Sequence, residues 1–388
     1  MEEIWSTKEE TKVILTKPLS LEFADSHDEY KAPNLLQLVL SLFKNIRRGS
    51  DLIQLQLPPT FNMPKSQLQC YGELVYCVGD DLLNKCNIGE SPIERFKAVL
   101  AWNFSTLRPL IFGVVPYNPI LGETHHVSKG TLNVLVEQVS HHPSVTALYA
   151  TDEKENIQLL WCQYPVAKFS GTLIEAETRG KRELKLMNHK ETYVMNSPNF
   201  LLKLFPPGVG WGGTYQVRCL ETGLEAELTI GGRSFVGLRG TPKSIIGKIF
   251  HSSSKNEPLF DINGHWDRSV TLKDLKSGEV NILYNAKKAI SGLKTPIVKD
   301  LKGVWQSESG VVWREVSQCI MEKNWAKAGE AKKDIEENQR MLMKERKSKS
   351  ETWVPKYFSV SYSKENGWDC SPLQKTIPPA PIVVPLNN

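Results

Sequence analysis

Two adjacent histidines, His141 and His142, are the residues of this sequence whose type and position most directly suggest chemistry. They lie in the stretch Glu-Gln-Val-Ser-His-His-Pro-Ser at 137–144, between two apolar segments. Neighbouring side chains of a strand point to opposite faces, so either one imidazole faces a core and the other solvent, or a bend brings both to one edge. Pro143 favours a sheet edge or a bend. Because imidazoles can donate hydrogen bonds or carry charge, the pair predicts an anion site.

Metal binding and nucleophilic catalysis are the alternatives for these histidines, and the spacing disfavours both. His125 and His126 form a second adjacent pair, whereas metal ligands that share one face follow H-x-H on strands and H-x-x-x-H on helices. Ser140 cannot meet His141 along a strand, and the sequence has no G-x-S-x-G elbow. We therefore expect no metal, no cofactor and no catalytic residue.

Two further segments are rich in turn-forming residues. The glycine cluster at 208–213 lacks the Lys-Ser/Thr pair of a phosphate loop, and the residues after it have a strand pattern, which favours a turn that enters a strand. The segment 116–123 reads Pro-Tyr-Asn-Pro-Ile-Leu-Gly-Glu. Its prolines hinder regular structure, so on pattern alone it is either a stiff loop or part of a binding site.

Bulk composition excludes several classes of protein. The 388 residues are 40% hydrophobic and include 10 Trp, enough for a sizeable core. A net charge of +5 suits contact with anionic lipid but not nucleic-acid binding. Seven scattered cysteines without a C-x-x-C pair indicate a reduced, cytoplasmic protein. No run reaches the ~18 apolar residues of a membrane span, and the start has no signal-peptide layout, so any membrane association would be peripheral.

The N-terminal part predicts a polar extension at 1–33 and then a short helix at 34–46. The helix is apolar around most of its circumference, at Leu35, Leu36, Leu38, Val39, Leu42 and Phe43. The basic residues Lys44, Arg47 and Arg48 follow at its end. Two interpretations remain open, a buried first helix or an apolar lid that closes a pocket and touches lipid when open.

The middle of the chain predicts one core helix and then many short strands. Ser91 and Glu94 predict a capping box, with Pro92 at the first helical position, and thus the start of a helix that runs to about residue 107. The strand runs lie at 131–139, 145–150, 157–162, 168–174, 183–188, 190–195, 213–219, 224–230, 234–239, 269–273 and 279–284, with turns expected at 128–130, 178–180 and 231–232. Strands without intervening helices indicate an antiparallel meander, sandwich or barrel, and their number favours closure around a ligand-sized cavity.

The C-terminal part predicts a charged helix at 317–349 and a proline-rich, extended tail at 371–388. Charges on such a helix usually form a solvated face with i,i+4 pairs. Lys332, Glu336 and Arg340 are spaced four apart, so they share one face.

Two motifs carry a resemblance to a known family. The segment at 116–123, followed by Glu-Gln-Val-Ser-His-His-Pro at 137–143, closely resembles the oxysterol-binding-protein-related family. The resemblance extends from about 34 to 370 and includes Trp-Val-Pro-Lys-Tyr-Phe at 353–358. It is closest to the short plant members that lack an N-terminal pleckstrin-homology domain.

The resemblance implies a mainly β fold with flanking helices, a near-complete antiparallel barrel around a hydrophobic tunnel. The lipid-binding domain would span 34–370, with a lid at about 34–56. A non-enzymatic protein of this kind moves sterol between membranes, in some members in exchange for phosphatidylinositol 4-phosphate. A carrier of phosphatidylserine or another phospholipid, and a lipid sensor without net transfer, are the alternatives.

The resemblance also assigns roles to individual residues. His141 and His142 would bind the 4-phosphate, and Asn118 would hold the headgroup near the tunnel mouth. Lys332, Glu336 and Arg340 match the family residues that contact the inositol phosphates. The resemblance also allows a protein partner at the endoplasmic reticulum and a location at membrane contact sites. The acidic tract with paired phenylalanines that usually marks such a partner does not occur in this sequence.

The chain departs from the family pattern at two positions. Val115 stands where a lysine is frequent, three residues before Asn118. A lost charge-assisted contact costs about 1.5–3 kcal/mol, which is roughly a ten- to hundredfold weaker headgroup interaction unless another cation substitutes. Ser144 replaces a second proline, which reduces rigidity mildly.

Overall fold

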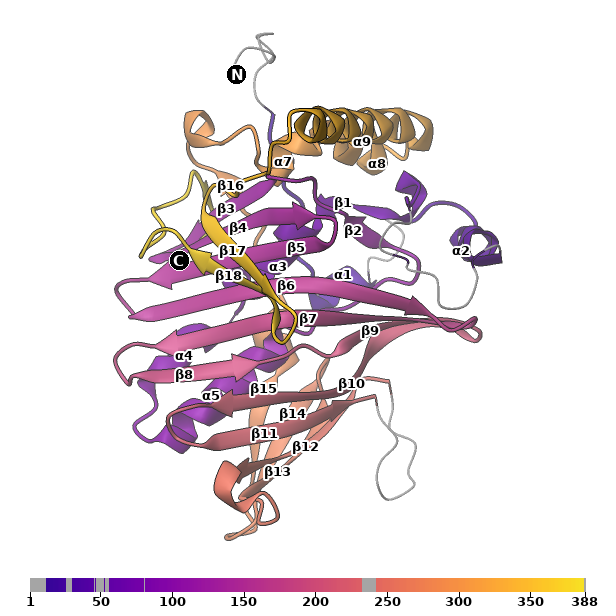
Figure 1. Cartoon of the computed structure of the whole chain (residues 1–388). Helices are drawn as coiled ribbons and strands as arrows, with labels where there is room; N and C mark the ends of the chain where they lie inside the picture. The colour runs from indigo at the N-terminus through magenta and orange to yellow at the C-terminus, as the bar shows by residue number, and fades with distance from the viewer. Residues whose placement is uncertain are drawn as a thin grey trace.

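The fold is built around one large, curved β-sheet that helices flank (Figure 1). The computed structural model describes residues 12–25, 30–44, 46, 52, 56–79, 81–231 and 242–386. The fifteen strands of the sheet are β3 (Thr124–Lys129), β4 (Leu132–His141), β5 (Ser144–Asp152), β6 (Ile157–Phe169), β7 (Leu173–Leu186), β8 (Glu191–Met195), β9 (Asn199–Leu204), β10 (Pro207–Cys219), β11 (Leu224–Ile230), β12 (Ser244–His251), β13 (Phe260–His265), β14 (Ser269–Asp274), β15 (Val280–Asn285), β16 (Ile297–Val298) and β19 (Ile382–Val383).

Sequence neighbours pair along almost the whole sheet, as expected for an antiparallel meander. The order runs β15-β14-β13-β12-β11-β10-β8-β7-β6-β5-β4-β3-β19-β16, and β9 pairs with both β10 and β7. The pairing is antiparallel except between β19 and β3. The extended tail therefore adds a strand to the sheet, because Ile382 and Val383 lie alongside Val127 and Ser128. Two small sheets join β1 (Asn62–Ser66) with β2 (Val115–Tyr117) in parallel, and β17 (Phe358–Ser363) with β18 (Gly367–Pro372) antiparallel.

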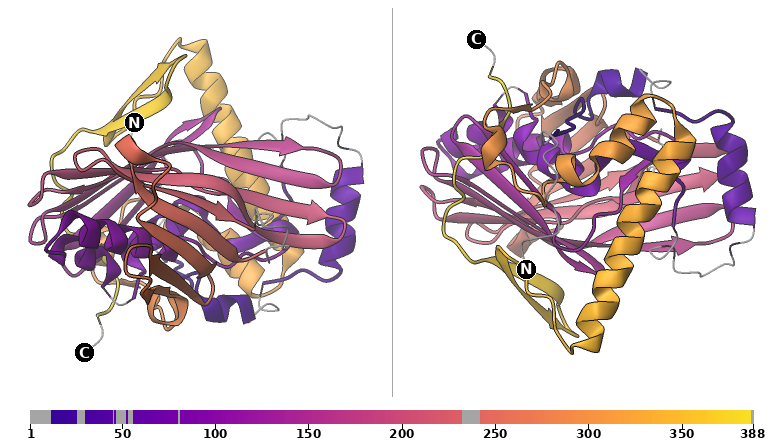
Figure 2. Two further views of the ribbon diagram at one scale, coloured as in Figure 1. Left: turned by 90° about the horizontal axis from the view of Figure 1, so that it is seen from below. Right: turned by 90° about the horizontal axis from the view of Figure 1, so that it is seen from above.

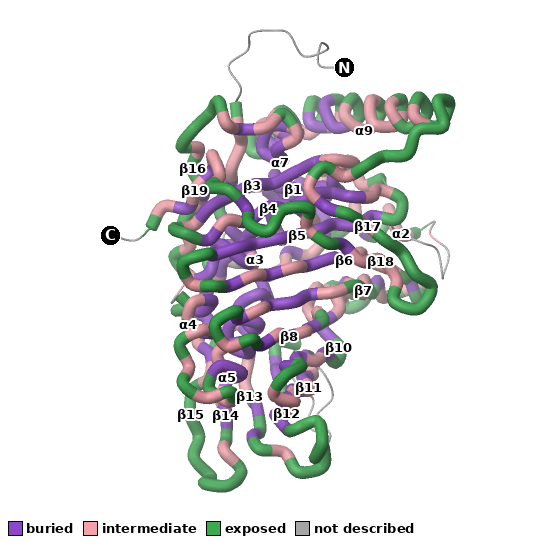
Figure 3. Tube along the Cα trace, turned by 60° about the vertical axis from the view of Figure 1, so that its left-hand side comes forward, coloured by how far each residue is buried: buried purple, intermediate pink, exposed green. Residues whose placement is uncertain are grey.

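The helices lie on different sides of the sheet (Figure 2). They are α1 (Leu21–Asp25), α2 (Leu35–Lys44), α3 (Gln67–Tyr76), α4 (Leu82–Ile88), α5 (Pro92–Ser105), α6 (Ala286–Ile290), α7 (Ser309–Val312), α8 (Arg314–Met321) and α9 (Trp325–Ser348). The views place α2 at the ends of the long strands β6 and β7, while α9 crosses near β1 and β2. Burial is concentrated in the central strands and in α3 and α5 (Figure 3).

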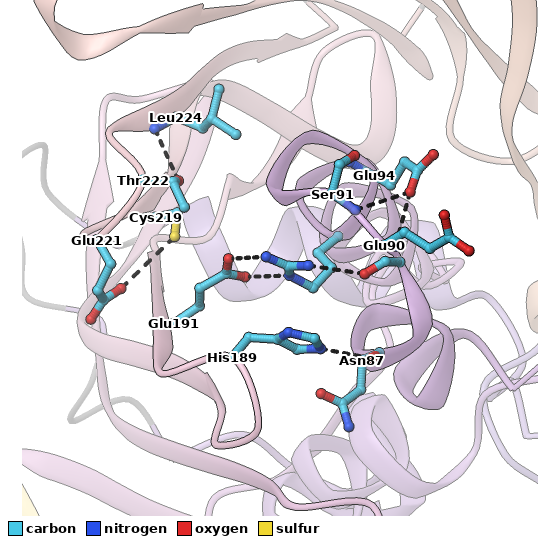
Figure 4. A network of polar contacts seen from close by, with 12 residues as sticks. Asn87, Glu90, Ser91, Glu94, His189, Glu191, Cys219, Glu221, Thr222 and Leu224 are labelled. Atoms are coloured by element: carbon cyan, nitrogen blue, oxygen red, sulfur yellow. Dashed lines mark hydrogen bonds and ion pairs between the residues drawn. The ribbon is translucent and has the colours of Figure 1, made fainter.

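Helix α5 confirms its prediction, because both hydrogen bonds of the capping box form. The Ser91 hydroxyl accepts from the backbone of Glu94, whose carboxylate accepts from the backbone of Ser91. The buried Arg95 then joins the helix to β8 through a bidentate ion pair with Glu191, a network drawn in Figure 4. Local hydrogen bonds of the capping box therefore define the start of this helix, and the ion pair between Arg95 and Glu191, which are distant in the sequence, joins it to the sheet.

Three predictions about the β-region were wrong. The segment 178–180 is not a turn but lies inside β7, where Gly180 allows close strand contact because a Cβ there would be 2.0 Å from the Cys162 carbonyl oxygen. The predicted strand 168–174 instead contains the turn between β6 and β7. The glycine cluster at 208–213 is not a turn but part of β10, paired with β9. The predicted strand 234–239 lies outside the described residues.

The single late helix predicted at 317–349 is two helices. The chain leaves α8 after Met321, and Lys323 adopts a left-handed conformation with φ 57°. Asn324 then caps α9 by accepting from the backbone N–H of Lys327. No glycine marks this break, so the continuous charge pattern concealed it. The predicted helix at 34–46 is confirmed as α2.

Candidate functional site

A single large cavity brings the predicted site residues together. It has a volume of about 1300 Å³ and is lined by segments from α2, β1, α3, β2, β4, β5, β6, β7, β9, β10, α9, β17 and residues 351–355. Its wall is mostly apolar, and it also includes Asn118, His141, His142, Lys332, Glu336 and Arg340. A cavity of this kind, apolar with a few convergent polar groups, is the usual form of a ligand site.

Helix α2 covers part of this cavity with one face. Its residues Val39, Leu42 and Phe43 line the cavity, and the ring of Phe43 lies 5.7 Å from that of Phe169 at the end of β6. Of the other predicted lid residues, Leu35 is buried, Leu38 is half-buried, and Leu36 is 42% exposed. The helix thus has an apolar face on the cavity and apolar side chains facing outward. Arg47 and Arg48 lie outside the described residues.

The loop at 116–123 is fixed by a buried carboxylate. Glu123 is 1% exposed and accepts hydrogen bonds from Ser66, Ser309, Trp313 and the backbone N–H of Ile120. Burial raises the pKa of Glu123, although these donors oppose the change. A carboxylate with this many donors orders the loop, and Asn118 is presented as an exposed residue on the cavity.

The two histidines lie at the turn between β4 and β5, with both rings at one edge. The ring centroids are 4.6 Å apart and nearly perpendicular. Nδ1 of the half-buried His141 donates to the Pro119 carbonyl oxygen at 3.0 Å, which leaves Nε2 for a ligand. Burial, and then the neighbouring His142, lower the pKa of His141. Of the two arrangements that the sequence left open, the structure contains the bend.

The departure at Ser144 has a local function. The side-chain amide of Gln138 donates to the Ser144 hydroxyl at 3.0 Å and to the Ser140 carbonyl oxygen at 2.8 Å. Serine thereby contributes a hydrogen bond to the turn of the two histidines, which a proline could not do in this way.

Lys332 is buried, and its ammonium is bound by protein groups. It donates to the Leu57 carbonyl oxygen at 2.5 Å and to Oδ1 of Asn62 at 2.6 Å. Oε1 of Glu336 lies 4.0 Å from Nζ of Lys332, and Oε2 lies 3.4 Å from Nη2 of Arg340, so one carboxylate pairs with both cations. Burial lowers the pKa of Lys332 to about 8, against the opposing effect of Glu336.

Asn62 is a site residue that sequence reasoning missed. Its amide nitrogen lies 3.3 Å from the carbonyl oxygens of Val115 and Pro116, while its oxygen accepts from Lys332. It therefore connects strand β2 to α9. Asn62 and Lys332 are 270 positions apart in the chain, and no local pattern signals such a contact.

Comparisons with known proteins identify the family of the chain. The family model of the oxysterol-binding proteins matches residues 39–375. Oxysterol-binding protein-related protein 4C of Arabidopsis thaliana is 53% identical, over 96% of this chain and 99% of that protein. Oxysterol-binding protein-related protein 8 of Homo sapiens is 30% identical, over 83% of this chain and 37% of that protein.

Solved structures share the fold. The Osh1 ORD domain in complex with cholesterol has a TM-score of 0.74 and 20% identity, and covers 93% of this chain and 90% of its own. The Osh3 ORD in complex with PI(4)P from Saccharomyces cerevisiae has a TM-score of 0.62 and 22% identity, with 94% of each chain covered. These structures confirm the mainly β fold predicted from the sequence. The family model matches residues 39–375, and the Arabidopsis relative is 53% identical over 96% of this chain; these two matches show that the chain belongs to the oxysterol-binding protein family.

Proposed function

We propose that this protein is a non-enzymatic lipid carrier that holds one sterol molecule in its cavity and moves it between membranes. The observation that carries the proposal is the cavity of about 1300 Å³, whose mostly apolar wall suits a lipid skeleton. The cholesterol bound to the structurally similar Osh1 domain supports sterol as the cargo. Each Å² of apolar surface removed from water contributes roughly 25 cal/mol, so a buried sterol is held mainly by the hydrophobic effect.

Loading requires access, and α2 is the element that would provide it. Val39, Leu42 and Phe43 face the cavity, whereas Leu36 and Leu40 are 42% and 45% exposed. In the proposed cycle α2 moves aside at a membrane surface, where its exposed leucines contact lipid and Lys44 favours anionic headgroups. The helix closes again over the loaded sterol. The carrier would act in the cytoplasm and contact membranes transiently. Within the described residues, no helix has the length and apolarity that a bilayer span requires.

Exchange against phosphatidylinositol 4-phosphate is the second half of the proposal. The imidazoles of His141 and His142, the amide of Asn118 and the cations Lys332 and Arg340 would bind the headgroup, and Glu336 would keep both cations in position. These residues line the same cavity as the apolar wall, so sterol and phosphoinositide would exclude each other. The PI(4)P bound to the similar Osh3 domain supports this ligand.

Competition between the two lipids tests the proposal directly. The protein is loaded with a fluorescent sterol, and vesicles that contain phosphatidylinositol 4-phosphate are titrated in; we expect displacement of the sterol. The double variant His141→Ala, His142→Ala should keep sterol binding and lose the displacement. Unchanged phosphoinositide binding in this variant would refute the role of the histidines.

The cargo and the transfer activity need separate measurements. Mass spectrometry of lipids that copurify with the protein should identify a sterol; phosphatidylserine as the main lipid would contradict the proposed cargo. Sterol transfer between vesicles is measured at catalytic protein concentrations. A rate no higher than spontaneous exchange would show a sensor rather than a carrier.

A further inference from the structure

We propose that Arg346 and Lys347 form a second cationic subsite at the cavity, which binds the phosphate monoester of a lipid headgroup and replaces the lysine that is absent at Val115. This inference rests on the proposed function, because it concerns phosphoinositide binding in the same cavity. Arg346 is half-buried and Lys347 is exposed, and both line the cavity. Neither belongs to the motifs that carry the family resemblance.

One face of α9 continues from the predicted headgroup residues to the new subsite. The cavity-lining positions of the helix are 332, 336, 339, 340, 343, 346 and 347. Their spacing of three to four residues places them on one side of the helix. The charged members are four cations and one carboxylate, so this face carries a net formal charge of +3.

The charge that is free for a ligand lies at the end of this face. Glu336 contacts both Lys332 and Arg340, and the Lys332 ammonium is also bound by Leu57 and Asn62. In contrast, no carboxylate of the described residues lies within ion-pair distance of Arg346 or Lys347. Arg346 does interact electrostatically with Glu345, but the carboxylate of Glu345 is paired with Lys349 at 2.6 Å. An anion that enters the cavity would therefore meet the least compensated positive charge at these two side chains.

Trp353 connects Arg346 to the rest of the site. The guanidinium of Arg346 lies 5.7 Å from the centroid of the Trp353 ring, a cation–π distance. The same indole packs on Gly122, where an added Cβ would lie 2.6 Å from the ring. The backbone N–H of Gly122 in turn donates to the backbone carbonyl oxygen of Gln138 at 2.9 Å. Trp353 thus links Arg346 indirectly to the two segments that carry Asn118 and His141.

The chemistry of these side chains suits a phosphate group. A guanidinium presents paired N–H donors that match two phosphate oxygens, and a nearby ammonium adds a point charge. Val115 lines the same cavity and offers only an apolar side chain. Arg346 and Lys347 can therefore supply the charge that the family pattern places at position 115.

The test compares Arg346→Gln and Lys347→Gln with Lys344→Gln as a matched control, since Lys344 is exposed on α9 but does not line the cavity. Extraction of phosphatidylinositol 4-phosphate from vesicles should weaken about tenfold with Arg346→Gln, the size of one lost charge-assisted contact, and stay unchanged with Lys344→Gln. Extraction from vesicles of phosphatidylinositol, which has no monoester, should not depend on Arg346. Equal effects of all three substitutions, or none, would overturn the proposal.

A rescue variant links the subsite to position 115. Val115→Lys should raise affinity little in the wild-type protein but restore most of the loss in Arg346→Gln, because either cation can serve the phosphate. Independent effects would refute the replacement. Soluble inositol 1,4-bisphosphate tests whether the ligand is a lipid or a free phosphate ester. If only phosphatidylinositol 4-phosphate in vesicles displaces the bound sterol, the ligand is the lipid headgroup. If the soluble compound binds more strongly than the vesicle lipid, the assignment to a lipid headgroup is contradicted. Sterol extraction is measured in every variant. A wild type that extracts sterol but no phosphoinositide would overturn this inference and leave the sterol carrier intact.

Discussion

Phosphoinositide binding should weaken as the pH rises from 7 to 9, because the site contains a lysine whose charge is lost in this range. Burial lowers the pKa of Lys332 to about 8. A phosphate monoester is close to a dianion above pH 7, so it favours the charged form of the lysine. The free protein must then take up a proton on binding wherever Lys332 is neutral, and affinity falls with rising pH.

The expected size of the effect comes from the charged fraction of the free protein. With a pKa of about 8, about nine-tenths of the Lys332 side chains are charged at pH 7 and about one-tenth at pH 9. An apparent dissociation constant rises in inverse proportion to the competent fraction, so affinity should fall about tenfold. That corresponds to about 1.4 kcal/mol. Sterol binding depends on apolar contacts and should stay constant.

The assay is extraction of phosphatidylinositol 4-phosphate from vesicles at pH 7, 8 and 9, with sterol extraction in parallel. Lys332→Arg keeps its charge throughout this range, so any binding that it retains should not fall between pH 7 and 9. A flat pH profile in the wild type, with circular dichroism showing an intact fold, would refute the role of the Lys332 charge. A sterol curve that falls equally would point to a general loss of structure instead.

Two further predictions concern the lid and the loop. Phe43→Ala removes the ring contact with Phe169, which is worth about 1 kcal/mol, so bound sterol should exchange several-fold faster against unlabelled sterol. Leu40→Ala is the control, because the Leu40 side chain is exposed and its removal should not change the exchange rate. Equal exchange rates for the two variants would contradict the closing role of α2. Glu123→Gln places an amide N–H₂ against groups that already donate hydrogen bonds, so the free energy of unfolding, measured by urea titration, should fall by about 2–4 kcal/mol. Glu330→Gln is the control, because Glu330 is exposed. A similarly small effect of both substitutions would show that the buried carboxylate does not order the loop.

Sequence reasoning succeeded where the decisive interactions are local. The start of α5 was predictable because Ser91 and Glu94 contact each other's backbone within one helical turn. The break between α8 and α9 was not, because Lys323 adopts φ 57° without a glycine to announce it. Gly180 misled for a related reason: glycine suits turns, but here it makes room for the Cys162 carbonyl oxygen of the neighbouring strand.

The candidate site shows the same division. Motifs at 116–123 and 137–143 identified Asn118 and the two histidines, and the structure brings these together with the late helix around one cavity. Neither motif indicates that Asn62 joins strand β2 to Lys332, or that Trp353 packs on Gly122. Such contacts depend on how distant segments pack, which no local pattern encodes.

The position of Lys332 suggests why a buried cation is useful in this cavity. Its ammonium holds together α9, the segment before β1, and through Asn62 the strand β2, so it forms part of the cavity wall as well as the polar site. An ion pair with Glu336 alone does not offset its burial, as the lowered pKa shows. A phosphate near this side chain would stabilise the charged form that burial disfavours. Binding of the headgroup would thereby strengthen the contact between α9 and β2, whereas a sterol gives Lys332 no such charge, so the two cargoes should differ in how firmly they fix α9.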